Sequence, residues 1–217
     1  MSAIIPWRDL AEVYGFIGNS LLRPMTQTAR VGVDPDFWDA FPSFGDPAIR
    51  DAVMECARHA DRASALKNDG GDPVEAASVE YTRLFVGPPS PAAPPWETMY
   101  RSKSATVGFG EPTFEMRRIL REAGLELSNE NRQYEDHMGI EILYLSTRCA
   151  AIGEATEDAE VEGADEQAAL GFIEDHPLAW IGSLRERVVN THPDGYFAAL
   201  LALAEAVLSW HAGLVRE

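Results

Sequence analysis

Apolar residues recur at intervals of three and four along nearly the whole chain, and this helical spacing is the feature that most limits the possible folds. It places apolar side chains on one face of each helix, where they must be buried against other helices. Runs of alternating β-branched residues, which are typical of strands, do not occur in the sequence. The sequence therefore predicts an all-α fold, a single bundle of roughly eight to ten helices. The main stripes are Trp7-Leu10-Tyr14-Ile17-Leu21, Ile49-Val53-Cys56-Ala60-Ala63, Val74-Ala77-Tyr81-Leu84, Met116-Ile119-Leu120-Ala123, Met138-Ile142-Leu145-Cys149-Ile152 and Tyr196-Leu200-Leu203-Val207-Trp210-Leu214.

Two stretches interrupt this pattern. Residues 87–110 contain five prolines and later two glycines, and proline both fixes φ and lacks the backbone N–H that a helix needs. This stretch is predicted to be a long proline-rich loop that follows a helix beginning at the Asp72-Pro73 cap and ending at Gly87-Pro88. Residues 154–166 carry seven acidic side chains and no basic one, which predicts a solvated connector, a candidate hinge before the C-terminal helices.

The charge of the chain limits its partners. Its 217 residues suit a single domain, and 18 Lys and Arg against 35 Asp and Glu give a net charge of −17. A surface this acidic repels phosphate backbones and anionic lipid, so neither nucleic acid nor a membrane is a predicted partner. The charge favours a basic partner such as a positively charged peptide.

The location of the protein is predicted to be cytoplasmic. Cys56 and Cys149 have no metal-type spacing and fall in apolar helical stripes, as buried free thiols in a reducing compartment do. No run approaches the roughly 18 consecutive apolar residues of a transmembrane helix. The N-terminal residues show no signal-peptide pattern.

The proline-rich loop carries a group of residues suited to peptide binding. Trp96 and Tyr100 are rigid aromatics, which lose little side-chain entropy on contact with a ligand. Glu97 lies between them and is able to pair with an arginine or lysine of that ligand. The alternative is that the loop folds these aromatics back onto the bundle.

A second group precedes the Met138 stripe. Asp136 stands where a helix N-cap is expected, and His137 and Glu141 share one helix face because they are four residues apart. Three interpretations stay open: a metal-binding enzyme that uses His137 and Glu141, a general acid/base pair, or a capped helix whose His137 is satisfied by Glu141. The first two lack support, since Glu-x-x-His, Cys-x-x-Cys and phosphate-binding loop patterns do not occur, and no cofactor is predicted.

Three segments, taken in order along the chain, form a combined pattern: Glu80-Tyr81-Thr82-Arg83-Leu84-Phe85-Val86-Gly87-Pro88, Pro95-Trp96-Glu97-Thr98-Met99-Tyr100 and Glu135-Asp136-His137-Met138-Gly139-Ile140-Glu141. Together they resemble the TorD/DmsD/NarJ family of redox-enzyme maturation chaperones. Phe172, His176, Trp180 and Tyr196-Phe197 extend the resemblance, which covers roughly residues 75–210.

The resemblance implies a chaperone without catalytic activity. Its implied partners are the apo catalytic subunit of a molybdopterin oxidoreductase of the dimethyl-sulfoxide-reductase type and the basic twin-arginine leader peptide of that subunit. Its implied roles are to assist cofactor insertion and to delay export. It also implies a monomer or a domain-swapped dimer, for which the 154–166 connector is a candidate hinge.

The resemblance further implies which residues bind the leader. Those at the family's motif positions are Leu84, Phe85, Trp96, Asp136 and His137, with Tyr81, Glu97, Tyr100 and Glu141 as neighbours. One position departs from the family pattern: Tyr134 stands where the family usually has a proline, two residues before the aspartate. Tyrosine lacks the fixed φ of proline, which puts the leader specificity in doubt and adds a candidate contact in the groove.

Overall fold

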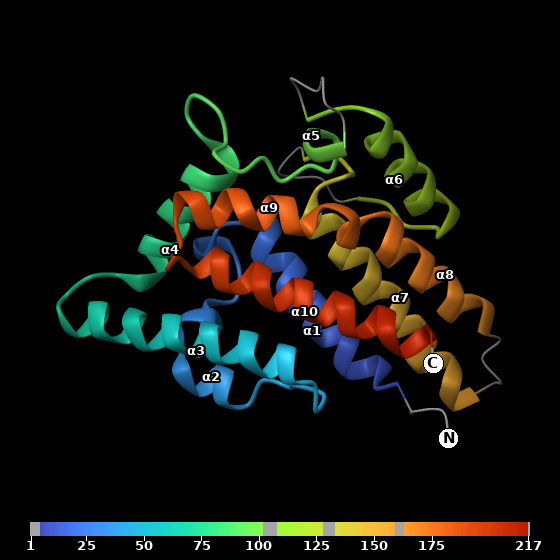
Figure 1. Ribbon diagram of the computed structural model, residues 1–217, viewed down its shortest axis with the longest axis horizontal. Helices are drawn as coiled ribbons and strands as arrows, with labels where there is room; N and C mark the ends of the chain where they lie inside the picture. Colours follow the sequence, from blue (N-terminus) through green and yellow to red (C-terminus); the bar gives the residue numbers. More distant parts are fainter. Residues whose placement is uncertain (1–4, 102–107, 128–132, 159–162, 217) are drawn as a thin grey trace.

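The computed structural model describes residues 5–101, 108–127, 133–158 and 163–216. These residues form an all-α fold, as predicted, and the only strand-like feature among them is one isolated bridge between Trp96 and His137 (Figure 1). The helices are α1 (Trp7–Leu22), α2 (Pro35–Asp39), α3 (Pro47–Asn68), α4 (Pro73–Tyr81), α5 (Thr98–Arg101), α6 (Glu111–Glu122), α7 (Met138–Asp158), α8 (Gly163–Asp175), α9 (Pro177–Thr191) and α10 (Tyr196–Arg216), with 3₁₀ turns at Met25–Gln27 and Arg30–Val33 and a π-helical turn, η3, at Thr82–Val86.

Three helices begin with an aspartate N-cap followed by a proline. The Asp72 carboxylate accepts hydrogen bonds from the backbone N–H groups of Val74 and Glu75, as the sequence predicts for the start of α4. Asp34 and Asp46 cap α2 and α3 in the same way, each followed by a proline at the first helical position. The α4–η3 helix ends at Gly87, whose φ of 98° is a conformation that favours glycine.

Helices α1 and α7 have the most extensive contact of any helix pair in the described residues. A methyl group on Gly18 would lie 2.9 Å from the carbonyl oxygen of Gly139, and one on Gly139 would lie 2.8 Å from the carbonyl oxygen of Gly18. The two glycines therefore let the helix backbones touch. This contact fixes the first turn of α7, which follows directly on the Asp136-His137 pair.

Helix α10 runs through the centre of the molecule, with α9 on one side and α3 on the other (Figure 1). Its N-terminus is capped from a distance, because the buried Glu80 carboxylate accepts hydrogen bonds from the backbone N–H groups of Tyr196 (3.0 Å) and Phe197 (3.1 Å). By length and composition alone Tyr196–Leu214 would suffice to cross a membrane, but 61% of the apolar window is buried in the fold, as in the core helix of a globular protein.

The predicted apolar stripes form one continuous core. Every residue of the α1, α3 and α7 stripes is buried, while Val74, Ile119, Ala123, Trp210 and Leu214 in the remaining stripes are half-buried. Cys56 and Cys149 are buried free thiols, as predicted. Burial raises the pKa of both thiols, that of Cys149 to about 12, so neither is a reactive thiolate at neutral pH.

The acidic connector is shorter than predicted. Helix α7 continues to Asp158 and α8 begins at Gly163, so most of the stretch 154–166 is helical rather than irregular. Its central residues, 159–162, lie outside the described part of the chain. The hinge at 154–166 stays a prediction.

Candidate functional site

The proline-rich loop and the start of α7 meet at a single backbone bridge. The N–H of Glu97 donates to the carbonyl of Asp136 (2.9 Å), and the N–H of Met138 donates to the carbonyl of Pro95 (2.9 Å). The two sequence motifs are therefore neighbours in space, and we call this region the α5–α7 junction. It contains six of the predicted leader-binding residues, namely Trp96, Glu97, Tyr100, Asp136, His137 and Glu141.

Asp136 holds the junction together but does not cap α7. Its fully buried carboxylate accepts hydrogen bonds from the Thr98 N–H (3.0 Å), the Thr98 hydroxyl (2.6 Å) and the Thr113 hydroxyl (3.0 Å). The prediction that Asp136 is the N-cap of α7 is wrong, because its side chain binds the starts of α5 and α6 instead. Burial raises the pKa of this carboxyl, and the hydrogen bonds from Thr98 and Thr113 oppose that rise.

His137 is the residue that caps α7. Its Nδ1 accepts a hydrogen bond from the Gly139 N–H at 3.0 Å, so the ring proton resides on Nε2. Nε2 is buried and has no hydrogen-bond partner among the described residues. Burial lowers the pKa of His137 to about 3, so the ring is neutral at physiological pH. The interpretation in which Glu141 satisfies His137 is therefore wrong.

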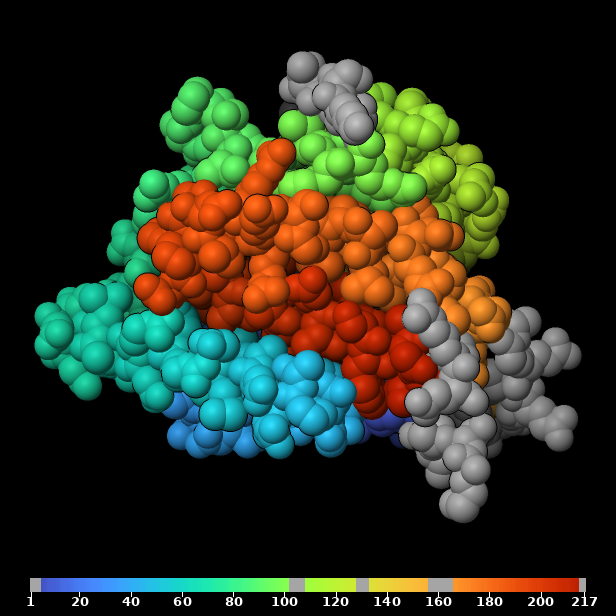
Figure 2. Space-filling model, in the orientation of Figure 1, coloured from blue at the N-terminus to red at the C-terminus, as the bar shows by residue number. Residues whose placement is uncertain are grey.

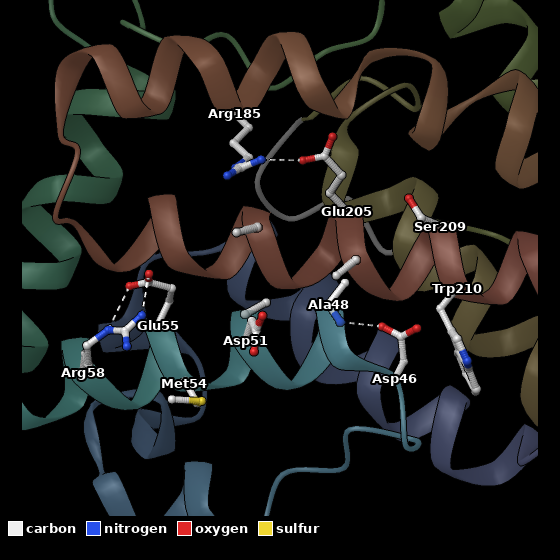
Figure 3. A pocket seen from close by; sticks show the side chains of 13 residues that line it. Asp46, Ala48, Asp51, Met54, Glu55, Arg58, Arg185, Glu205, Ser209 and Trp210 are labelled. Atoms are coloured by element: carbon white, nitrogen blue, oxygen red, sulfur yellow. Dashed lines mark hydrogen bonds and ion pairs between the residues drawn. The ribbon is translucent and has the colours of Figure 1, made fainter.

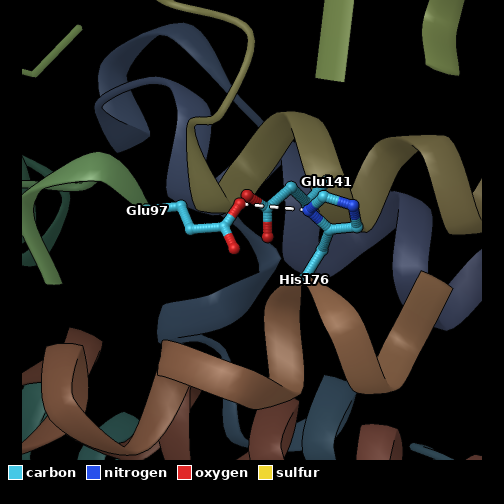
Figure 4. A group of neighbouring side chains, drawn as sticks. All are labelled: Glu97, Glu141 and His176. Atoms are coloured by element: carbon cyan, nitrogen blue, oxygen red, sulfur yellow. Dashed lines mark hydrogen bonds and ion pairs between the residues drawn. The ribbon is translucent and has the colours of Figure 1, made fainter. Parts of the chain in front are cut away.

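Glu141 instead belongs to a buried acidic group with Glu97 and His176 (Figure 4). Glu141 Oε2 accepts a hydrogen bond from the Trp180 indole N–H (3.0 Å), while Glu97 Oε2 lies 3.1 Å from His176 Nδ1. Both glutamates are fully buried. Burial, followed by repulsion from Glu97, raises the pKa of Glu141 well above its usual range, so Glu141 is the neutral member of the carboxyl pair.

These three side chains are the group in the described structure best placed to hold a metal ion. Their ligand atoms lie within 4.8 Å of one another. The sequence missed His176 as a partner of the two glutamates, because it lies on the turn before α9 and nothing in its local pattern connects it with Glu97. His137, which the metal interpretation requires, is not part of this group.

Aromatic side chains cover the outer side of the junction. Half-buried Trp96 contacts Tyr134 (6.0 Å between ring centroids), Tyr134 contacts Phe109 (5.3 Å), and Phe109 contacts Phe114 (5.1 Å). We call these four residues the aromatic surface; Phe114 is 50% exposed, and Phe109 and Tyr134 are each 39% exposed. Sequence reasoning raised Tyr134 as a contact but missed Phe109 and Phe114.

Tyr100 is held on the inner side of the loop. Its ring stacks on Trp180 with 5.2 Å between centroids, and the guanidinium carbon of Arg187 lies over the Tyr100 ring, 4.7 Å from its centroid. Trp96 and Tyr100 are both half-buried. The alternative in which the loop folds its aromatics back onto the bundle therefore describes Tyr100, whereas Trp96 also joins the outer aromatic surface.

The remaining predicted residues lie in the core, away from the surface. Tyr81, Leu84 and Phe85 are 4%, 0% and 2% exposed. The Tyr81 hydroxyl donates to the carbonyl of Leu22 (2.8 Å), and Phe85 contacts Phe197 (5.1 Å between centroids). A peptide cannot touch these three side chains in this conformation, and their assignment to leader binding stays a prediction.

A separate groove lies on another face, between α3, α9 and α10, where α10 is recessed (Figures 2 and 3). Its volume is about 960 Å³, and it contains none of the predicted leader-binding residues. Two surface ion pairs, Arg58–Glu55 and Arg185–Glu205, line it. This groove provides matched control positions for experiments on the junction.

Fold and junction together define the class: a helical binding protein that presents aromatic side chains beside a buried acidic group. The chain matches the family described as the nitrate reductase delta subunit over residues 46–186, and it belongs to this family, which includes the TorD, DmsD and NarJ chaperones. The resemblance inferred from the three motifs is thereby confirmed.

Individual relatives are chaperones by name. The chaperone protein TorD of Vibrio cholerae is 26% identical over 131 residues, which are 60% of this chain and 58% of that protein. The Tat proofreading chaperone DmsD of Salmonella paratyphi A is 26% identical over 136 residues, 62% of this chain and 60% of that protein. TorD of Photobacterium profundum is 24% identical over 198 residues, 90% and 89% of the two chains.

The first two relatives are therefore matched over less than two thirds of their own length. The family and these names indicate a redox-enzyme maturation chaperone rather than an enzyme. The alternative of a metal-binding enzyme built on His137 and Glu141 is not supported, either by the relatives or by the geometry of those two residues.

Proposed function

We propose that this protein is a cytoplasmic chaperone that binds the twin-arginine leader peptide and the apo catalytic subunit of a molybdopterin oxidoreductase of the dimethyl-sulfoxide-reductase type. In this proposal it assists cofactor insertion and delays export until the client is mature. One relative is named a Tat proofreading chaperone, which supports a leader peptide as the ligand.

The observation that carries the proposal is the position of the aromatic surface directly beside the buried carboxyl groups of the α5–α7 junction. Trp96 belongs to the aromatic surface, and the next residue, Glu97, belongs to the acidic group. A leader peptide combines arginines with an apolar stretch, and the junction offers complementary groups for both. The net charge of −17 adds long-range attraction for a basic peptide.

Within this proposal the leader-binding residues differ in how they act. Trp96 is accessible and provides direct apolar contact, whereas Asp136 acts by holding α5 and α6 in place. His137 is a positioning residue because it caps α7. Tyr81, Leu84 and Phe85 support the helix that leads into the loop.

Replacing Trp96 or Asp136 by alanine is expected to weaken binding of a synthetic twin-arginine leader about tenfold or more while leaving helicity intact. Titration calorimetry measures binding, and circular dichroism measures helicity. Trp210→Ala is the matched control, since Trp210 is also half-buried and stacks on Phe44, but it lines the separate groove. If both junction variants bind the leader as the parent does, the proposed site is in the wrong place.

We also propose that the chain is a single chaperone domain, active as a monomer or as a dimer that swaps its C-terminal helices at the 154–166 connector. Such an exchange requires a segment between α7 and α8 that extends without loss of core contacts. Size-exclusion chromatography with light scattering tests this proposal. A monomer as the only species at all concentrations would count against the swap.

A further inference from the structure

Arg101 forms an ion pair with Glu97 that joins a solvent-accessible cation to a fully buried anion. One terminal nitrogen of the Arg101 guanidinium lies 2.7 Å from Glu97 Oε1 and 3.0 Å from the carbonyl oxygen of Asp175. The Arg101 side chain is 46% exposed, whereas that of Glu97 is 0% exposed. The guanidinium therefore reaches the buried carboxylate from the solvent side.

The surroundings of this pair contain more negative than positive charge. Glu115 and Asp175 act electrostatically on Arg101 in addition to Glu97, while Glu141 behind Glu97 is neutral. His176 faces the second oxygen of Glu97, and Arg187 is engaged over the Tyr100 ring. Arg101 therefore pairs directly with one carboxylate, that of Glu97, and two further carboxylates act on it electrostatically, an arrangement that suits a further cation.

A buried carboxylate without a cation is energetically costly, so the Glu97 site is expected to be occupied by a cation at all times. Arg101 is a readily removable occupant, because it is half exposed and lies at the end of the four-residue helix α5. If a second guanidinium replaced that of Arg101, the charge-assisted hydrogen bond to Glu97 would be preserved. An ammonium group lacks the planar, forked arrangement of N–H donors that a guanidinium offers to a carboxylate.

We propose that Glu97 is a guanidinium-binding site that Arg101 fills in the free chaperone and that an arginine of the leader fills in the complex. This inference rests on the proposed function, since it identifies the atoms that recognise the leader. Arg101 acts as an internal competitor. The exchange makes the site selective for arginine over lysine, while the aromatic surface beside it contributes the apolar contact.

The first experiment tests the site without any leader. In Arg101→Ala the carboxylate loses its cation, so the melting temperature is expected to fall, and ethylguanidinium at tens of millimolar is expected to raise it again by about 2–4 °C. Ethylammonium at equal ionic strength is expected to restore less than half of that shift. Arg58→Ala is the matched control: Arg58 is 51% exposed and, like Arg101, pairs with a glutamate a few residues earlier in the chain, but that partner, Glu55, is 54% exposed. Its melting temperature should respond equally to both cations.

The second experiment measures leader affinity. Removing the competitor is expected to lower the Kd of Arg101→Ala for a twin-arginine leader about threefold to tenfold, with no such gain for a twin-lysine leader or for Arg58→Ala. Arg101→Gln, which keeps an N–H donor near Glu97, replaces the alanine variant if that one does not fold.

Equal rescue by both cations, together with unchanged or weaker leader binding in the Arg101 variants, would overturn the proposal. If the parent binds no leader at all, the proposed function fails, and the ethylguanidinium shift alone decides whether Glu97 is a guanidinium site.

Discussion

The helix end at Tyr81–Phe85 and the α5–α7 junction resemble the same chaperone family equally well in sequence, yet they occupy opposite environments. Leu84 and Phe85 are core residues whose neighbours are other apolar side chains. The centre of the α5–α7 junction is also buried, but its side chains are polar. Its outer side is the exposed aromatic surface. A family motif can therefore mark either the scaffold of a site or its contact surface, and burial separates the two.

The sharpest test of this comparison is a core deletion in the helix end. Leu84→Ala is expected to lower the free energy of unfolding by about 2–5 kcal/mol, because it removes a fully buried side chain and leaves a cavity. Val86→Ala, two residues further along and 56% exposed, is expected to cost no more than about 0.5 kcal/mol. Urea denaturation measures both. A Leu84→Ala variant of normal stability that binds leader poorly would place Leu84 in the binding surface instead.

The contrast also shows how far sequence reasoning reaches. The stripes of α1, α3 and α7 and the Asp72 cap follow from spacing within one helix, so they were predictable and are confirmed. The junction depends on contacts between distant segments: Thr98 and Thr113 bind Asp136, and His176 binds Glu97. Local spacing placed the cap of α7 on Asp136, but the backbone bridge to the loop shifts that role to His137.

The polar character of the junction predicts a pH dependence that an apolar core would not have. The pKa of His137 is about 3 in the folded protein because the ring is buried, against about 6.5 in the unfolded chain. Between these values the unfolded chain binds one more proton, so stability is lost as the pH falls below 6.5. The expected contribution is about 1.4 kcal/mol per pH unit.

His137→Asn isolates this contribution, because the asparagine oxygen keeps an acceptor for the Gly139 N–H but does not titrate. Between pH 6.5 and 5 the stability of the variant should fall less steeply than that of the parent. Burial also lowers the pKa of His211, to about 4, but His211 is present in both proteins and its contribution cancels in the comparison. Parallel stability curves would show that His137 is not held neutral by burial.

The smallest expected effect concerns Glu141, the neutral member of the carboxyl pair. Its contribution to the pH dependence of stability has the opposite sign to that of His137. The pKa of Glu141 is raised by burial and then by repulsion from Glu97, so the folded protein retains a proton that the unfolded chain has lost at neutral pH. That difference lowers stability as the pH rises above about 4.5. Glu141→Gln removes it while keeping an acceptor for the Trp180 indole N–H and a donor toward Glu97. The variant is expected to be more stable than the parent at pH 7, and its advantage is expected to increase as the pH rises.

Glu141→Ala provides the contrasting case, since it leaves the Trp180 N–H buried without an acceptor and should lose about 1–3 kcal/mol. Thermal unfolding followed at pH 5, 6, 7 and 8 distinguishes the two: the advantage of Glu141→Gln should grow with pH. If Glu141→Gln instead destabilises the protein increasingly toward pH 8, the Glu141 carboxylate is ionised in the folded state. The α5–α7 junction would then hold a further buried negative charge, and Arg101 or an incoming leader arginine would bind Glu97 with an ionised Glu141 beside it.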